Sequence, residues 1–199
     1  MKRTSCILTI FVALTMIAAT FPGGQSQLTI NDQSRMWVDG TSTIHDWMCE
    51  VGTVEGSIML DAEVGQVSNA VVTVPSASID CDNSTMNKKA SKALSVGDYP
   101  TIRFTLDEAD VARDGKDLRI EALGKLEMAG ATKAVEASLV GQPAADGGFR
   151  FMGSMPIVMS DFGVDAPTAM LGTIRTGDEV TVRFELVTDA GFPSMTSAK

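Results

Sequence analysis

Long stretches of this sequence alternate between apolar and polar residues. In segments 102–107, 118–128 and 180–186 nearly every second side chain is apolar, and the residues between them are polar or charged. A period of two places the two kinds of side chain on opposite faces of a β-strand. This alternation is typical of antiparallel strands with one face toward a core and the other toward water. The sequence therefore predicts an all-β fold.

Further segments with strand character extend this pattern to about eight strands. They lie at 34–42, 44–60, 67–79, 132–141 and 148–159. Sequences rich in Gly and Asp, such as 113–116 and 146–148, separate the strands and favour tight turns.

One segment, residues 84–96, has a helical period instead. Its apolar residues form a single stripe at helical spacing: Met86, Ala90, Ala93 and Leu94. Asn83 or Ser84 can cap the beginning of this helix, and Gly97 suits the position just after its end. We therefore expect one short helix inserted among the strands.

Eight amphipathic antiparallel strands leave two architectures open, a β-sandwich and a closed up-and-down barrel. A barrel of this size can hold one elongated ligand in its lumen. The apolar face of the predicted strands carries no run of carboxylates and no pairing of Asp or Glu with His. Such a lumen suits a lipid better than a sugar or a nucleotide.

The first residues have the pattern of a secretory signal peptide. Lys2 and Arg3 precede an apolar run over 6–19 and a boundary of small residues. The run is too short to span a bilayer comfortably, and no later stretch is long and apolar enough to do so. We expect three parts: a leader over 1–24 cleaved between 19 and 26, a β-barrel domain over 27–189, and a flexible tail over 190–199.

The charge of the chain disfavours several partners. It has 16 basic and 25 acidic residues, a net charge of −9, which becomes −11 when Lys2 and Arg3 leave with the leader. An acidic protein repels nucleic-acid phosphates, so we expect no nucleic-acid partner. The same argument disfavours anionic membrane surfaces, and we expect no stable membrane insertion.

Two cysteines, Cys49 and Cys81, follow the leader. An exported protein meets oxidising conditions, which favours a disulfide between them. The chain-entropy argument gives such a bridge about 3–4 kcal/mol of stabilisation. The alternative is a pair of buried free thiols.

The single histidine lies in the densest group of unusual side chains, residues 42–49. On an extended strand His45, Trp47 and Cys49 would share one face. Three interpretations stay open: a hydrogen-bonded structural histidine beside a core tryptophan, part of the wall or mouth of a ligand cavity, and a metal site formed with Cys49 and Cys81. A disulfide would use two of the three metal ligands.

Motifs of catalysis are missing from the sequence. It contains no nucleophile elbow, phosphate-binding loop or HExxH zinc motif. Acid–base chemistry would have to use His45 with Asp46 or Asp161, and neighbouring strand residues such as His45 and Asp46 point to opposite faces. Because acid–base groups must converge on one substrate, we expect no enzyme, no metal and no cofactor.

Four ordered motifs over residues 34–187 resemble the YceI-like family. They are 40–47 followed by 54–56, 92–94 followed by 98–104, 126–135, and 160–164 followed by 177–180. The resemblance implies an extended lipocalin-like β-barrel, exported to the bacterial periplasm, that binds isoprenoid or other amphiphilic lipids in an apolar tunnel without catalysis. The sequence Ser-Thr-Ile-His-Asp-Trp differs from the more usual aromatic-rich lead into the histidine. A quinone, a fatty-acyl derivative and a polyprenyl phosphate therefore stay open as ligands.

These observations predict an exported, non-enzymatic barrel that binds or carries an amphiphilic lipid. Because few arginines lie near the predicted strands, we favour a neutral or weakly polar head group. The residues expected to face the ligand are Val38, Ile44, His45, Trp47, Ile102, Phe104, Leu106, Ile120, Leu126, Val135, Phe151, Met155, Phe162, Val182 and Phe184. The rival hypothesis is a barrel filled by its own side chains that binds a protein partner. The sequence is compatible with a monomer and with a homodimer.

Overall fold

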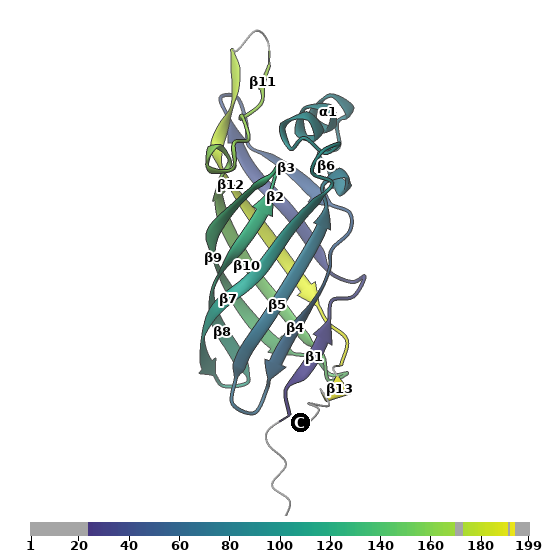
Figure 1. The fold of residues 1–199 in the computed structure, drawn as a ribbon, viewed down its shortest axis with the longest axis vertical. Coiled ribbons are helices and arrows are strands. Elements are labelled where there is room, and N and C mark those ends of the chain that lie inside the picture. Colours follow the sequence, from purple (N-terminus) through teal and green to yellow (C-terminus); the bar gives the residue numbers. More distant parts are fainter. Residues whose placement is uncertain (1–23, 170–172, 191, 194–199) are drawn as a thin grey trace, which may run out of the picture.

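The alternating segments form β-strands in the computed structural model, which describes residues 24–169, 173–190 and 192–193 (Figure 1). The described elements are, in chain order, β1 (Ser26–Thr29), β2 (Arg35–Ser42), β3 (Trp47–Val51), β4 (Glu55–Asp61), β5 (Gln66–Pro75), the 3-10 helix η1 (Ser76–Ser78), β6 (Ile79–Asp80), α1 (Ser84–Ala93), β7 (Thr101–Asp114), β8 (Asp117–Met128), β9 (Ala131–Pro143), β10 (Phe149–Val158), the 3-10 helix η2 (Met159–Phe162), β11 (Thr168–Ala169), β12 (Ile174–Val187) and β13 (Phe192–Pro193). The predicted leader falls on residues 1–23, outside the described residues, apart from Gly24.

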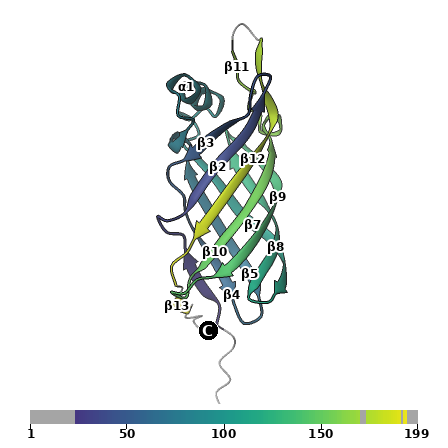
Figure 2. The same cartoon turned by 180° about the vertical axis from the view of Figure 1, so that it is seen from behind.

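The strands form one antiparallel sheet in the order β13-β1-β4-β5-β7-β8-β9-β10-β12-β2-β3-β6, and β11 pairs with β12. The sheet curls around one long axis into an elongated barrel with strongly tilted strands (Figures 1 and 2). At one end the two sides of the sheet meet, because Ile30 forms a β-bridge with Thr188 and the Asp189 amide donates to the Thr29 carbonyl at 3.0 Å.

The all-β antiparallel fold with one helix confirms the sequence prediction, but the count of eight strands is wrong. The predicted strand 44–60 is two strands: β3 pairs with β2, whereas β4 pairs with β1 and β5. β1 was missed, as were the two-residue strands β6, β11 and β13, which are too short to show alternation. The expected likeness to lipocalins stays a prediction.

Alternation of buried and exposed side chains sets the inward face of each strand. In β8 every second residue from Leu118 to Met128 is buried. In β7 the inward set changes partway, because the register with β8 shifts between Leu106 and Glu108. The extra residue, Asp107, is a β-bulge, and it moves Ala109 and Val111 onto the inner face in place of the even-numbered positions.

The barrel is packed solid at the end where β1 lies. Leu28, Leu60, Leu118 and Phe151 are almost completely buried there. The Thr188 hydroxyl is also buried, and it donates to the Phe149 carbonyl at 3.1 Å while accepting from the Phe149 amide at 3.0 Å. This end therefore contains the most deeply buried side chains of the described core.

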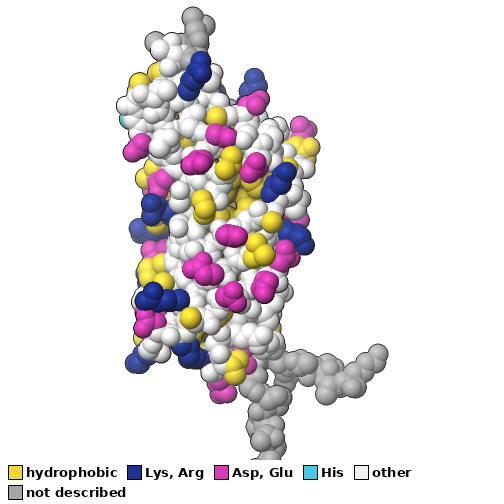
Figure 3. Space-filling model, turned by 90° about the vertical axis from the view of Figure 1, so that its left-hand side faces the viewer, with side chains coloured by type: hydrophobic (Ala, Val, Ile, Leu, Met, Phe, Trp, Pro, Cys, Tyr) yellow, Lys and Arg dark blue, Asp and Glu magenta, His cyan; other side chains and the backbone are white. Residues whose placement is uncertain are grey.

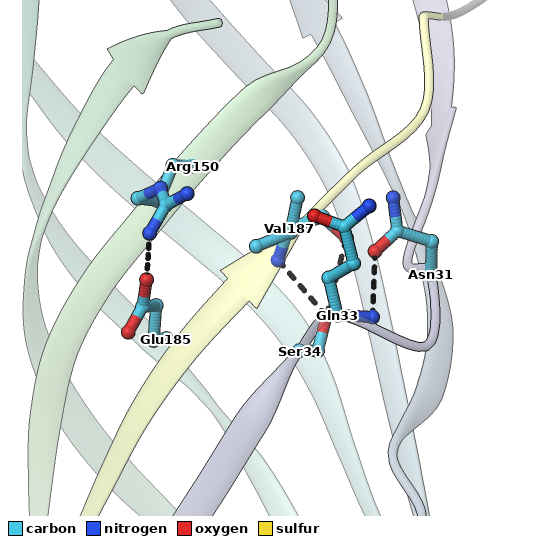
Figure 4. A network of polar contacts seen from close by, with 6 residues as sticks. All are labelled: Asn31, Gln33, Ser34, Arg150, Glu185 and Val187. Atoms are coloured by element: carbon cyan, nitrogen blue, oxygen red, sulfur yellow. Dashed lines mark hydrogen bonds and ion pairs between the residues drawn. The ribbon is translucent and has the colours of Figure 1, made fainter.

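Polar contacts on the outer surface tie strands together near this end (Figure 4). The Ser34 hydroxyl accepts from the Val187 amide at 2.9 Å and donates to the Val187 carbonyl at 3.2 Å. Arg150 on β10 forms an ion pair with Glu185 on β12. These contacts fix the beginning of β2 and the beginning of β10 to the end of β12.

The helix α1 lies at the opposite end of the barrel, beside β11 (Figures 1 and 2). The Asn83 side chain caps α1 by accepting from the Thr85 and Met86 amides. None of the residues of α1 is fully buried, so the helix covers the barrel end without joining the packed core. Among the described residues, no helix combines the length and apolar character needed to cross a membrane.

A disulfide and a hydrogen-bonded carboxylate hold the beginning of α1 to the barrel. Cys49 on β3 and Cys81 form the predicted disulfide. The Asn87 side chain donates to the Asp80 carboxylate at 2.8 Å and accepts from the Cys81 amide at 2.7 Å. The hydrogen bond from Asn87, followed by that from the Asp82 amide, lowers the pKa of the Asp80 carboxyl below its usual 3.8.

Candidate functional site

The inside of the barrel contains a cavity of about 420 Å³. This volume lies within the range of small-molecule pockets, about 300–1,000 Å³. Most of the side chains that line it are aliphatic, aromatic or methionine, and none of the described lining residues is Asp or Glu. The wall is therefore built to contact an apolar guest.

The structure brings most of the predicted site residues together around this cavity. Thirteen of the fifteen line it: Val38, Ile44, His45, Trp47, Ile102, Phe104, Leu106, Ile120, Leu126, Phe151, Met155, Val182 and Phe184. The strand period predicts this well, because inward positions on a curled sheet all face one lumen.

Val135 and Phe162 do not line the cavity, although both were predicted to do so. They are buried in the packed core instead. Phe162 belongs to η2, which packs against β9 and β12, and the period of a strand does not apply to a 3-10 helix. Val135 lies on β9, which η2 covers.

Glycines make room for two aromatic rings in the wall. A Cβ atom at Gly40 would lie 2.1 Å from the Trp47 ring, and one at Gly124 would lie 2.5 Å from the Phe104 ring. Gly40 and Trp47 are directly opposite each other on β2 and β3. The Trp47 indole donates from Nε1 to the Thr41 carbonyl at 2.9 Å. Sequence reasoning missed these glycines, because their partners depend on the strand register.

The polar lining residues gather at the α1 end of the cavity. They are Ser42, His45, Lys89, Thr168 and Thr176. Ser42 at the end of β2 pairs with Thr176 on β12. The Lys89 ammonium donates to the Thr168 carbonyl at 2.6 Å and so connects α1 to β11. This end of the cavity is its mouth, where Ile44 and His45 are exposed to solvent.

His45 lies in the turn between β2 and β3 rather than on a strand. Its Nδ1 is 2.7 Å from the Asp46 carbonyl, and because a carbonyl only accepts, Nδ1 carries the proton. His45 is thus both a hydrogen-bonded residue and part of the cavity mouth. The third interpretation, a metal site, is not supported: the disulfide uses Cys49 and Cys81, and the described residues contain no group of three metal-ligating side chains.

The helix contributes a part of the wall that sequence reasoning did not assign to the site. Its apolar stripe, Met86, Ala90, Ala93 and Leu94, lines the cavity together with Lys89. The stripe itself was visible in the sequence. Nothing in the period of a helix, however, tells which surface of the barrel it covers.

Comparison with protein-family models gives a match to the YceI-like domain over residues 24–188. The chain belongs to the YceI-like domain family. Comparison with curated protein sequences gives no match.

Solved structures share the fold of this YceI-like chain. BcnA of Burkholderia cenocepacia is 20% identical with a TM-score of 0.65, and the match covers 79% of this chain and 98% of BcnA. A polyisoprenoid-binding domain from Saccharophagus degradans, implicated in plant cell wall breakdown, is 14% identical with a TM-score of 0.64, over 83% of this chain and 99% of that one. The YceI protein of Campylobacter jejuni is 19% identical with a TM-score of 0.55, over 71% and 84%. At these identities the likeness shows the fold.

Proposed function

We propose that this YceI-like chain binds or carries one amphiphilic lipid of isoprenoid, quinone or fatty-acyl type. The observation that carries the proposal is the cavity itself, which is apolar along the barrel and polar only at its mouth. A structural relative is a polyisoprenoid-binding domain, which supports the same class of ligand. The cavity volume argues against the rival, a barrel filled by its own side chains.

The distribution of polar groups orients the proposed guest. Its tail lies among Phe104, Ile120 and Phe151 within the barrel, and its head group lies near Ser42 and Thr176 at the mouth. An apolar chain gains about 25 cal/mol for each Å² that it removes from water, so the tail is the part that the deep cavity stabilises.

A neutral or weakly polar head group fits this mouth. Lys89 is the one lysine or arginine among the described lining residues, and it already donates to a backbone carbonyl. Arg150 and Arg183 are on strands but pair on the outside with Glu185 and Asp39. A diphosphate would require several converging cations.

We also propose that the chain is not an enzyme. General acid–base catalysis needs at least two titratable groups that converge on one substrate. The described lining residues offer His45 and Lys89 but no carboxylate, and His45 uses Nδ1 in a backbone hydrogen bond. The apolar wall binds a guest but supplies no group to activate it.

Export to the periplasm is part of the proposal. The leader-like sequence at 1–24 supports it. The disulfide between Cys49 and Cys81 also supports it, because disulfides form and persist in oxidising compartments and are rare in the cytosol.

The test is native mass spectrometry of the protein purified from its export compartment, followed by organic extraction. We expect one extra mass per chain that extracts as an isoprenoid, quinone or fatty-acyl lipid. A protein that purifies empty and also takes up neither quinones, polyprenols nor fatty acids would contradict lipid binding and favour the filled barrel with a protein partner.

A further inference from the structure

The outer face of α1 differs in charge from the rest of the molecule. Residues 83–97 contain three lysines and no acidic residue, in a chain with 25 acidic and 16 basic residues. Lys88 and Lys92 are exposed and lie one helical turn apart. Because the apolar stripe of α1 lines the cavity, these two ammonium groups lie on the opposite side of the helix and face away from the barrel.

This basic face lies beside the cavity mouth. α1 lies at the same end of the barrel as the turn between β2 and β3, while β11 and the beginning of β12 reach further along the barrel axis (Figures 1 and 2). Ile44, in the turn between β2 and β3, also lines the mouth and is 62% exposed. A large aliphatic side chain held in water at the rim of an apolar cavity gains by entering an apolar boundary.

We propose that the basic face of α1 docks the mouth of the protein onto an anionic phospholipid surface. Lys88 and Lys92 contact the lipid head groups, and Ile44 enters the interface. The inference rests on the proposed function, because an amphiphilic guest exchanged with a bilayer must pass between that bilayer and the mouth. The contact is peripheral and reversible, since two lysines and one aliphatic side chain give only modest binding.

The overall negative charge opposes membrane contact but also orients it. Figure 3 shows acidic side chains distributed over the barrel wall. At the mouth, Asp82 and Asp98 flank α1, and Asp46 lies next to the exposed turn. Charges more than about 8 Å apart are largely screened at physiological ionic strength, so the residues nearest the surface decide the interaction. Lys88 and Lys92 attract an anionic surface, whereas the acidic side chains that flank α1 oppose it.

Vesicle co-sedimentation tests the proposal. We expect the protein to sediment with vesicles that contain phosphatidylglycerol, not with vesicles of phosphatidylcholine alone, and to be released by high salt. The variant Lys88→Gln/Lys92→Gln should bind the anionic vesicles about 30-fold more weakly. The matched control, Arg35→Gln/Lys116→Gln, removes two positive charges from the packed end and should bind as the parent does.

Three results would overturn the proposal: no sedimentation of the parent protein with anionic vesicles, equal binding of the lysine variant, or binding that high salt does not release. Uptake of a fluorescent fatty acid without vesicles separates this proposal from the proposed function. Uptake of the lipid without vesicle binding would overturn membrane docking alone, whereas failure of the parent protein to take up fatty acids, quinones and polyprenols alike would contradict lipid binding itself.

Discussion

At the scale of single residues, glycines decide where the aromatic rings of the cavity wall lie. Gly40 on β2 lies directly opposite Trp47 on β3. The indole occupies the space that a side chain at Gly40 would fill. Gly124 does the same for Phe104. The two glycines thus determine the shape of the cavity wall together with the aromatic rings that they accommodate.

Gly40→Ala tests this arrangement. Its Cβ would lie 2.1 Å from the Trp47 ring, so the ring must move and lose its hydrogen bond to Thr41. We expect a loss of about 1–3 kcal/mol in the free energy of unfolding, measured by urea titration. The control is Gly97→Ala, where a Cβ meets nothing within 4 Å. Equal stability of the two variants would contradict the close packing.

Phe104→Arg tests the cavity as a binding site. The guanidinium would enter an apolar wall and present a charge to the lipid tail. We expect the folded variant to lose uptake of a fluorescent lipid. Thr101→Arg changes an exposed residue of the same strand and should bind normally. Unchanged binding by a folded Phe104→Arg variant would remove Phe104 from the site.

At the scale of elements, the strand period predicted which side chains face inward, but it did not predict where strands break or which distant strands pair. The inward faces of β8 and of β7 up to Leu106 follow directly from alternation, and the helix follows from its own period, whereas the bulge at Asp107 does not follow from alternation. The break between β3 and β4 did not, because residues 52–54 interrupt a run of strand-forming sequence too briefly to show. Pairings between distant strands, such as β12 with β2, depend on how the sheet curls, which no local pattern contains.

The turn between β8 and β9 offers a stabilising substitution. Ala129 and Gly130 both have positive φ and join paired Met128 and Ala131, as in a type I′ turn. Alanine is strained in this conformation, whereas asparagine tolerates it. We expect Ala129→Asn to raise the free energy of unfolding by about 0.5–1 kcal/mol in urea titration. A decrease would show that the half-buried Ala129 methyl matters more than the backbone.

Removing the disulfide should loosen α1. The variant Cys49→Ala/Cys81→Ala should lose about 3–4 kcal/mol of stability in the same titration, because the unfolded chain is no longer constrained. Hydrogen exchange should increase most in α1, which has no fully buried residue to hold it. A uniform increase over all strands would instead mean that the bridge stabilises the barrel as a whole.

At the scale of the whole molecule, stability and binding are separated along one axis. The most deeply buried side chains include Leu28, Leu60 and Leu118, whereas the cavity opens at the end where α1 lies. A barrel that is solid at one end can keep a hollow at the other without losing its fold.

Ligand binding should therefore raise the melting temperature. A lipid present at a hundred times its Kd adds about 2.7 kcal/mol, which corresponds to about 5–10 °C for a protein of this size. Thermal melts with and without quinone, polyprenol or fatty acid measure the shift. The Phe104→Arg variant is the control and should show none; an equal shift in that variant would place the lipid elsewhere.

Among the described residues, the packed end lies opposite the mouth of the cavity. A guest that entered through the mouth would meet Phe151 at the packed end, with Leu28, Leu60 and Leu118 behind it. A guest chain longer than the cavity would leave its surplus in water. A shorter chain would leave the bottom of the cavity empty. The depth of the cavity would therefore select guests by chain length as well as by chemistry.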